Sequence, residues 1–161
     1  MKAFRETLAA VGLLSAIFLV VFNYRELPQR IPTHFDASGV ANGWGDKSSL
    51  WVLVGIACFL YLLLTLVRFL PPNSMNIPVS QEKRAAAIPL ALAMIGWLKF
   101  ETMCIVAFIL WSTVAVAQGQ RQGLSAWFLP VTLVAVFGTT IFYILRMKSL
   151  SATNDRPTER E

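Results

Sequence analysis

Charged residues are scarce in this chain of 161 residues, and so are the residue types that carry most enzyme chemistry. Only 14% of the residues are charged, whereas soluble domains carry roughly 25%, so the composition argues against a soluble domain. The chain has one histidine, His34, and two cysteines, Cys58 and Cys104. Both cysteines fall inside apolar runs, where we expect small buried hydrophobes rather than a disulfide framework or a metal site.

No pattern in the sequence indicates an enzyme or a nucleic-acid-binding protein. We find no nucleophile–base pair, no spaced cluster of metal ligands and no glycine-rich phosphate loop. The net charge is +5, but basic residues beside anionic lipid account for it without a nucleic-acid partner. The sequence therefore predicts a non-enzymatic protein that uses no cofactor and no metal ion.

Long apolar runs dominate the chain, and 56% of its residues are hydrophobic. Four runs cover residues 8–24, 50–67, 88–117 and 124–145. A helix of about 20 apolar residues crosses a hydrocarbon layer of roughly 30 Å, and lipid forces every backbone amide to be paired within the segment. No run alternates with the period of two that a barrel strand shows. The predicted fold class is an all-α integral membrane protein with four transmembrane helices.

The predicted domain organisation is a single four-helix transmembrane domain over residues 1–150, followed by a disordered cytoplasmic tail over residues 151–161. The tail has no apolar periodicity. The first run follows Lys2 and Arg5, as the core of a secretory signal would, but no small-x-small cleavage site follows it. We therefore expect the first run to be a retained span.

Lysine and arginine predict the orientation, because they concentrate on the cytoplasmic side of a membrane protein. Nine flank the spans on the side that carries both termini, and four lie on the other side. The nine are Lys2, Arg5, Arg68, Lys83, Arg84, Arg146, Lys148, Arg156 and Arg160, and the four are Arg25, Arg30, Lys47 and Arg121. We expect a multi-pass protein of the cell (cytoplasmic) membrane, embedded in the lipid bilayer, with both termini in the cytoplasm.

The segment between the first two runs, residues 25–48, is polar and rich in proline and glycine, and we call it the outer cap. Pro28 and Pro32 push the residue before each of them into an extended conformation. Three glycines are expected to supply turns with positive φ: Gly39, Gly43 and Gly45. Four apolar side chains are expected to press the cap onto the helices: Ile31, Phe35, Val40 and Trp44. This combination predicts a structured extracytoplasmic loop.

Residues 27–47 carry the pattern Leu-Pro-x-x-Ile-Pro-x-His-Phe, followed by a glycine, a Gly-Trp pair and a lysine. This pattern resembles the amino-terminal domain of unknown function of SdpI-like membrane proteins, and with the flanking helices the resemblance covers roughly residues 4–66. The best-known member of that family is an immunity protein, which protects a toxin-producing bacterium from its own secreted peptide and holds a transcriptional repressor at the membrane. The resemblance implies immunity or sensing, with a secreted peptide or a cytoplasmic regulator as partner.

Nine residues of the pattern are candidates for motif or partner binding: Pro28, Ile31, Pro32, His34, Phe35, Gly39, Gly43, Trp44 and Lys47. The chain also departs from the family in two ways. The immunity protein that it resembles has more transmembrane helices than four. The family pattern commonly has an acid just before the Gly-Trp pair, where this chain has Asn42.

His34 has three possible roles: a hydrogen-bonding partner of backbone groups in the cap, a group that recognises a ligand, or a metal ligand together with Asp36. A metal site needs three or four ligands, and the cap offers only Asp36, Asp46 and Glu26 besides His34. We therefore favour the structural role.

Lys99 and Glu101 are the charged residues inside the third run, where each costs roughly 2.5–3.5 kcal/mol to insert. Because they are two residues apart, they point about 200° apart on a helix and do not pair directly. An alternative function is a small transporter or permease-like subunit, with Glu101 as the titrating group of a proton or ion relay. We favour a second interpretation, in which residues 88–97 lie partly in the membrane interface and Lys99 extends to the membrane surface. The position of Glu101 distinguishes the two.

Overall fold

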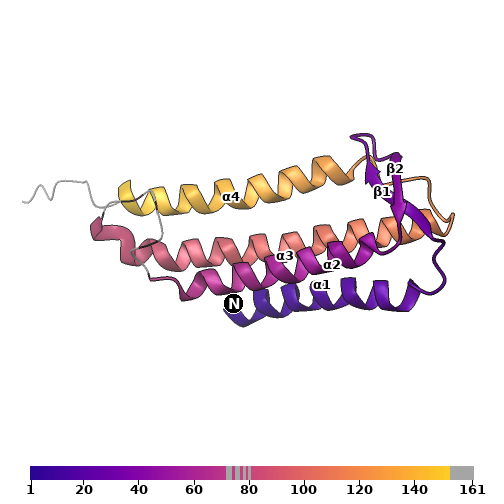
Figure 1. The fold of residues 1–161 in the computed structure, drawn as a ribbon. Helices are drawn as coiled ribbons and strands as arrows, with labels where there is room; N and C mark the ends of the chain where they lie inside the picture. Colours follow the sequence, from indigo (N-terminus) through magenta and orange to yellow (C-terminus); the bar gives the residue numbers. More distant parts are fainter. Residues whose placement is uncertain (72–73, 75–76, 78, 80, 153–161) are drawn as a thin grey trace, which may run out of the picture.

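The structure is a computed structural model that describes residues 1–71, 74, 77, 79 and 81–152. Four long helices lie alongside one another, and a β-hairpin joins the first two (Figure 1). The helices are α1 (Lys2–Asn23), α2 (Ser49–Leu66), α3 (Arg84–Ala117) and α4 (Phe128–Ala152), with short 3-10 segments η1 (Val67–Phe69) and η3 (Gln81–Lys83). The hairpin consists of β1 (Arg30–Phe35) and β2 (Ala41–Asp46). We call the end with the hairpin the hairpin end, and the opposite end the terminal end.

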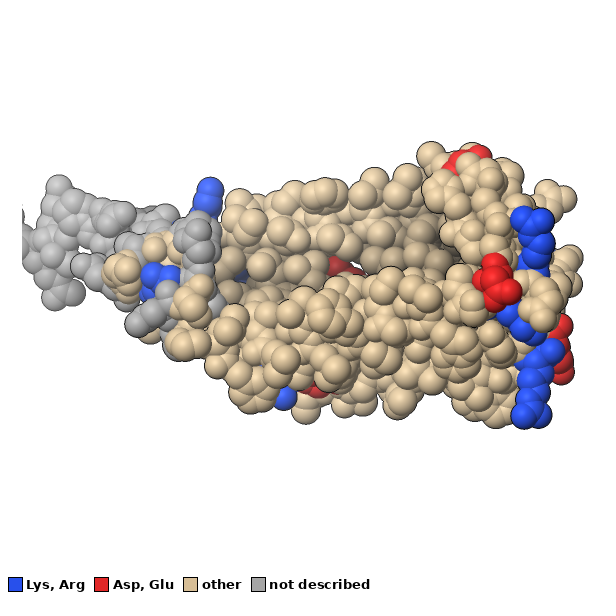
Figure 2. Space-filling model, in the orientation of Figure 1, with Lys and Arg blue, Asp and Glu red and all other residues tan. Residues whose placement is uncertain are grey.

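All four helices are long and apolar enough to cross a membrane, as predicted. Their surfaces expose large apolar side chains: Phe18 of α1 is 60% exposed and Val134 of α4 is 74% exposed. Charged side chains gather at the hairpin end and are few along the flank of the helices (Figure 2). Water would penalise such an apolar flank and lipid would not, so the structure is consistent with a multi-pass membrane protein.

Helix α3 is the central element, because it contacts α1, α2 and α4. Small residues allow close packing with α1: a Cβ on Gly12 would lie 3.1 Å from the Cβ of Met103. One apolar core lies toward the hairpin end and includes Val20, Ile31 and Leu110. Helix α4 lies along α3 at the side of this three-helix core, which leaves a groove between α3 and α4.

Several predicted boundaries differ from the observed ones. Helix α1 begins at Lys2, six residues earlier than its predicted span, and α4 begins at Phe128 rather than at residue 124. Residues 88–97 continue α3 without a break, because a second apolar core around Ala87, Ala91 and Met147 supports this part of the helix. Ser151 and Ala152 are helical, and the rest of the predicted tail, residues 153–161, lies outside the described residues.

The prediction of an all-α fold is incomplete, because the outer cap forms a two-stranded antiparallel sheet. Pro32 is part of β1 and lies opposite Trp44 of β2. A proline lacks the N–H that a central strand needs, but both strands of a two-stranded sheet are edge strands and can contain it. The register shifts on both sides of His34, so the hairpin is irregular where the pattern has its histidine.

Candidate functional site

The tip of the hairpin is a turn held by the carboxylate of Asp36. Its Oδ1 accepts hydrogen bonds from the backbone nitrogens of Ser38 and Val40, both at 2.9 Å, and from the Ser38 hydroxyl at 2.6 Å. The bond from the Ser38 hydroxyl is the largest cause that lowers the pKa of the Asp36 carboxyl below its usual value. The Asp36 carboxylate therefore stabilises the turn to which it belongs. Within the described part of the chain, no cluster of three His, Cys, Asp or Glu side chains could hold a metal ion.

The tip docks on the connection between α3 and α4. The backbone nitrogen of Leu124 donates to the oxygen of Gly39 at 2.8 Å, and Val40 forms a β-bridge with Gly123. Gly39 has a φ of +88°, and a Cβ on it would lie 2.5 Å from the Leu124 oxygen. A Cβ on Gly123 would lie 2.1 Å from the Gly39 oxygen. Two glycines thus allow the hairpin to reach from α2 across to the segment that leads into α4.

The prediction that Gly43 and Gly45 supply turns is wrong, because both lie inside β2 and only Gly39 of the three has a positive φ. Lack of space explains these two glycines. A Cβ on Gly43 would lie 2.8 Å from the Cβ of His34, and one on Gly45 would lie 2.9 Å from Cγ2 of Thr33. The side chains of β1 therefore cross over β2 at these two positions.

His34 forms a hydrogen bond across the hairpin, with its Nδ1 2.5 Å from Oδ1 of Asn42. An amide oxygen only accepts, so Nδ1 is the donor in this contact. His34 was expected to hydrogen-bond backbone groups, and its partner across the hairpin is a side chain instead. Asn42, the residue that departs from the family pattern, is that partner.

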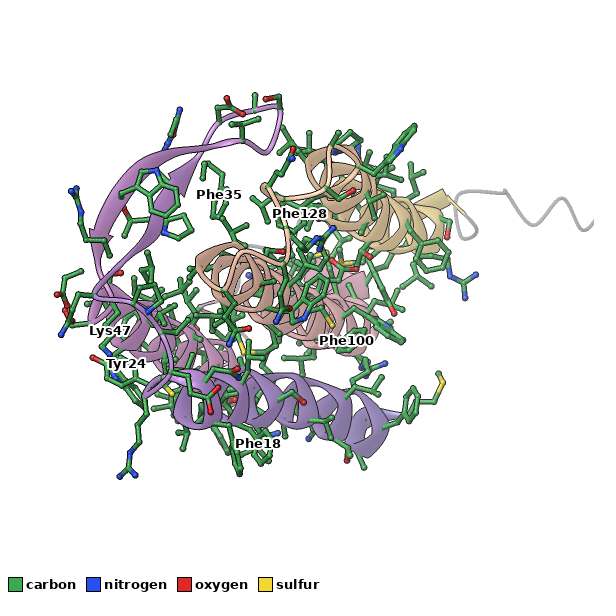
Figure 3. The ribbon with its side chains drawn as sticks, turned by 90° about the vertical axis from the view of Figure 1, so that its right-hand side faces the viewer. Phe18, Tyr24, Phe35, Lys47, Phe100 and Phe128 are labelled. Atoms are coloured by element: carbon green, nitrogen blue, oxygen red, sulfur yellow. The ribbon has the colours of Figure 1, made fainter. Side chains whose placement is uncertain are left out.

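Lys47 connects the end of α1 to the start of α2. Its Nζ donates to the backbone oxygens of Tyr24 at 3.3 Å and Leu27 at 3.1 Å, and it lies 5.0 Å from the centre of the Tyr24 ring. Figure 3 shows Lys47 and Tyr24 together at this corner of the molecule. These contacts satisfy carbonyls that follow α1, so Lys47 holds the fold together at the base of the hairpin.

Only some of the four apolar residues expected to dock the cap do so. Ile31 is fully buried, and Leu27 beside it is 4% exposed. Trp44 and Val40 are 50% and 55% exposed, so the prediction is wrong for both. The exposure of Trp44 follows from the alternation of β2, in which every second residue is exposed and Trp44 occupies one of these positions. Trp44 is therefore available to a partner.

A cavity of about 430 Å³ lies beneath the hairpin, and we call it the hairpin niche. Such a volume is within the usual range for ligand pockets. Phe35 points from the hairpin into this region, toward the helices (Figure 3). The residues that line the niche are Pro32, Thr33, His34, Phe35, Ser49, Leu50, Val52, Leu53, Ile56, Ile109, Thr113 and Leu124.

The niche brings together three of the predicted site residues: Pro32, His34 and Phe35. The others are not in its lining: Pro28, Ile31, Gly39, Gly43, Trp44 and Lys47. Sequence reasoning missed the walls from α2 and α3, such as Ile56 and Ile109. No signal marked them, because an apolar residue in a membrane span looks the same whether it faces lipid or a cavity.

The prediction that Lys99 extends to the membrane surface is wrong, because its side chain is 1% exposed in the interior. Its Nζ donates to the carboxylate of Glu6 and, at 3.0 Å, to Oγ1 of Thr65. It also lies 4.4 Å from the centre of the Tyr61 ring. The second oxygen of Glu6 is 3.7 Å from a guanidinium nitrogen of Arg68. Lys99 thus joins α3 to both α1 and α2.

Glu101 lies on another side of α3 and contacts α4. Its Oε1 accepts a hydrogen bond from Oγ1 of Thr139 at 2.5 Å. Its Oε2 is buried and has no hydrogen-bond partner. Glu101 and Lys99 therefore bond to different helices, as their spacing predicted. Neither expected environment of Glu101 is found, since it lines an apolar groove rather than a polar cavity or a basic surface.

In a comparison with known families, residues 11–58 match the family model of DUF1648, a domain of unknown function. The comparisons with curated proteins and with solved structures find no match. The matched segment contains much of α1, the whole hairpin and the part of α2 that lines the niche, whereas α3 and α4 lie outside it.

Proposed function

We propose that this chain is a non-enzymatic membrane protein whose hairpin niche binds an apolar segment of a secreted peptide, for immunity to that peptide or for sensing it. One observation carries the proposal: the segment that matches DUF1648 builds the roof and one wall of a cavity of about 430 Å³. Within that segment, Pro32, His34 and Phe35 are both part of the family-like pattern and part of the lining.

The chemistry of the niche suits an apolar or aromatic side chain. Its walls are mainly aliphatic, with Leu53 and Ile56 from α2 and Ile109 from α3. An amphipathic peptide that lies in the membrane interface presents such side chains toward the protein. The exposed Trp44 of β2 supplies a second contact outside the niche lining, and tryptophan is among the residue types enriched in binding hot spots.

The proposal requires the hairpin to face the outside of the cell. The excess of lysine and arginine on the terminal side, nine against four, supports this orientation in the cytoplasmic membrane. A secreted peptide would then reach the hairpin directly. A cytoplasmic regulator would instead meet the terminal end, where α1 begins and α4 ends.

The alternative of a proton or ion transporter has less support. A relay needs polar groups that pass a proton or ion from one to the next. Lys99 is already paired with Glu6, and Glu101 contacts Thr139 on another side of α3. Among the described side chains, no hydrogen bond joins these two sets.

The proposal can be tested by filling the niche. Ile56 lines it and is 48% exposed, so Ile56→Trp adds bulk at the mouth without disturbing a core. Phe59→Trp is the matched control, since Phe59 lies on the same helix, is 63% exposed and does not line the niche. The variants are expressed in a bacterial host and challenged with a panel of secreted amphipathic peptides, and survival and membrane abundance are measured.

We expect the wild-type chain and Phe59→Trp to protect the host against at least one peptide, and Ile56→Trp to lose that protection at unchanged abundance. His34→Ala should also lose protection at normal abundance if the ring contacts the peptide. If His34 only holds the hairpin, protection should fall in proportion to abundance. A wild-type chain that protects against no peptide contradicts the immunity proposal, and an Ile56→Trp variant that protects fully contradicts the niche as its site.

A further inference from the structure

A second cavity, of about 420 Å³, lies between α3 and α4, and we call it the α3–α4 groove. It shares no lining residue with the hairpin niche. Its lining is mainly aliphatic and aromatic, with the hydroxyls of Ser125 and Thr132, the thiol of Cys104 and Glu101 as the one charged residue. The residues are Phe100, Glu101, Cys104, Ile105, Phe108, Ser125, Trp127, Phe128, Val131, Thr132 and Ala135.

The carboxylate of Glu101 has no counterion among the described residues. Its Oε1 contacts the neutral hydroxyl of Thr139, and its Oε2 is buried without a partner. The nearest buried cation in sequence, Lys99, is paired with Glu6 instead. A lone carboxylate in apolar surroundings is electrostatically unfavourable, and a cation held nearby would balance it.

The aromatic rings of the groove also favour a cation. Phe128 of α4 stacks on Phe108 of α3, with ring centres 5.0 Å apart and planes 11° from parallel. Phe100 and Trp127 line the same groove, and Figure 3 shows Phe100 and Phe128 on the two helices that border it. The faces of such rings attract cations, most strongly where water is excluded.

We propose that the α3–α4 groove binds a lipophilic organic cation that carries no N–H donor, such as a phosphonium or a quaternary ammonium. A cation of this class needs no hydrogen bond, which fits a carboxylate with one oxygen occupied and the other buried. At 1.5 Å per residue, Glu101 lies about 24 Å from the end of α3 at Ala117, within the apolar part of the helix.

Binding of radiolabelled tetraphenylphosphonium to the purified full chain in detergent tests the charge of Glu101. Glu101→Gln keeps an acceptor for Thr139 and removes the charge, and Glu26→Gln makes the same charge change at an exposed site. We expect the affinity to fall at least about tenfold in Glu101→Gln and to stay unchanged in Glu26→Gln. Equal affinities in the wild type and Glu101→Gln overturn the proposal.

Two further variants keep the test decisive if Glu101→Gln does not fold. Ala135→Phe fills the groove from an exposed position and leaves the carboxylate in place, and Leu133→Phe is its control outside the lining. We expect Ala135→Phe to lose tetraphenylphosphonium binding at least about tenfold while Leu133→Phe binds like the wild type. Unchanged binding by Ala135→Phe overturns the proposal.

Cys104 reports on the groove directly, because it lines the groove and is an exposed free thiol. In a Cys58→Ser background it is the only cysteine of the chain. Tetraphenylphosphonium should slow its reaction with a membrane-permeant maleimide, whereas neutral tetraphenylsilane of the same shape should not. Equal slowing by both compounds would indicate simple partition of apolar molecules and would overturn the cation site. Neither outcome bears on the hairpin niche.

Discussion

Removal of the negative charge on Glu6 should destabilise the protein more than removal of an exposed acid, because Glu6 is the counterion of the buried Lys99. In Glu6→Gln the Lys99 ammonium loses its counterion and keeps only neutral partners: an amide oxygen at position 6, the Thr65 hydroxyl at 3.0 Å and the Tyr61 ring at 4.4 Å. Loss of one partner of a buried ion pair costs about 3–5 kcal/mol. The Glu6 side chain is 28% exposed, so we expect a loss near the lower limit, about 3 kcal/mol.

The opposite change, Lys99→Met, should cost much less. It removes the buried charge itself and leaves an apolar side chain in the same space, while Glu6 keeps Arg68 at 3.7 Å. Replacement of buried charges by apolar groups of similar volume is often close to neutral. The double variant Glu6→Gln/Lys99→Met should therefore recover most of the stability that Glu6→Gln loses.

The free energy of unfolding is measured by titrating mixed micelles with sodium dodecyl sulfate and following tryptophan fluorescence. Glu26→Gln is the control at an exposed position and should change stability by less than about 0.5 kcal/mol. The wild type, the two single variants and the double variant form a double-mutant cycle, and their four free energies of unfolding give the coupling energy between Glu6 and Lys99. The reasoning is refuted if Glu6→Gln and Glu26→Gln are equally stable, or if the double variant is no more stable than Glu6→Gln.

Three further predictions concern the hairpin. Gly39→Ala places a Cβ 2.5 Å from the Leu124 oxygen at a φ of +88°, so the tip of the hairpin can no longer dock as it does in the wild type. Hydrogen exchange should then show loss of protection in β1 and β2 while α3 stays protected, and unchanged protection of the strands would contradict the docked tip. Hydrogen bonds lower the pKa values of Asp36 and Asp46 in the folded state, so the stability that these two carboxylates contribute is present at neutral pH and is lost as the pH falls below about 3.8. Protection factors of hairpin amides should therefore be lower at pH 3 than at pH 7, and equal factors would argue against these hydrogen bonds. Ser38→Cys, in a chain without Cys58 and Cys104, should react with an impermeant maleimide from outside the cell, whereas reaction only from the cytoplasm would reverse the proposed orientation.

The four helices could be predicted from the sequence because span length and hydrophobicity are local properties of each run. The partner of Lys99 could not, because Glu6 is 93 residues away and precedes the predicted start of the first span. A contact of this kind depends on how helices pack, and run length carries no information about packing.

The hairpin was only partly predictable for a related reason. Its prolines and Asp36 act through their own backbone, so an extended segment and a turn could be inferred. The roles of Gly43 and Trp44 depend on register, which one shifted residue reverses. Nothing in the local sequence distinguishes the α2 and α3 residues that line the hairpin niche from residues that face lipid. Only the tertiary structure brings Ile56 and Ile109 into the same cavity as Phe35.

Photo-crosslinking from the hairpin niche tests the central claim most directly. p-Benzoylphenylalanine replaces Phe35, which lines the niche, or Phe59, which is exposed and does not line it, in cells challenged with a peptide against which the chain protects. We predict a crosslinked product with the mass of that peptide from position 35 and none from position 59, and Ile56→Trp should abolish the product. Equal crosslinking from both positions, or a product that persists in Ile56→Trp, would contradict the niche as the peptide-binding site.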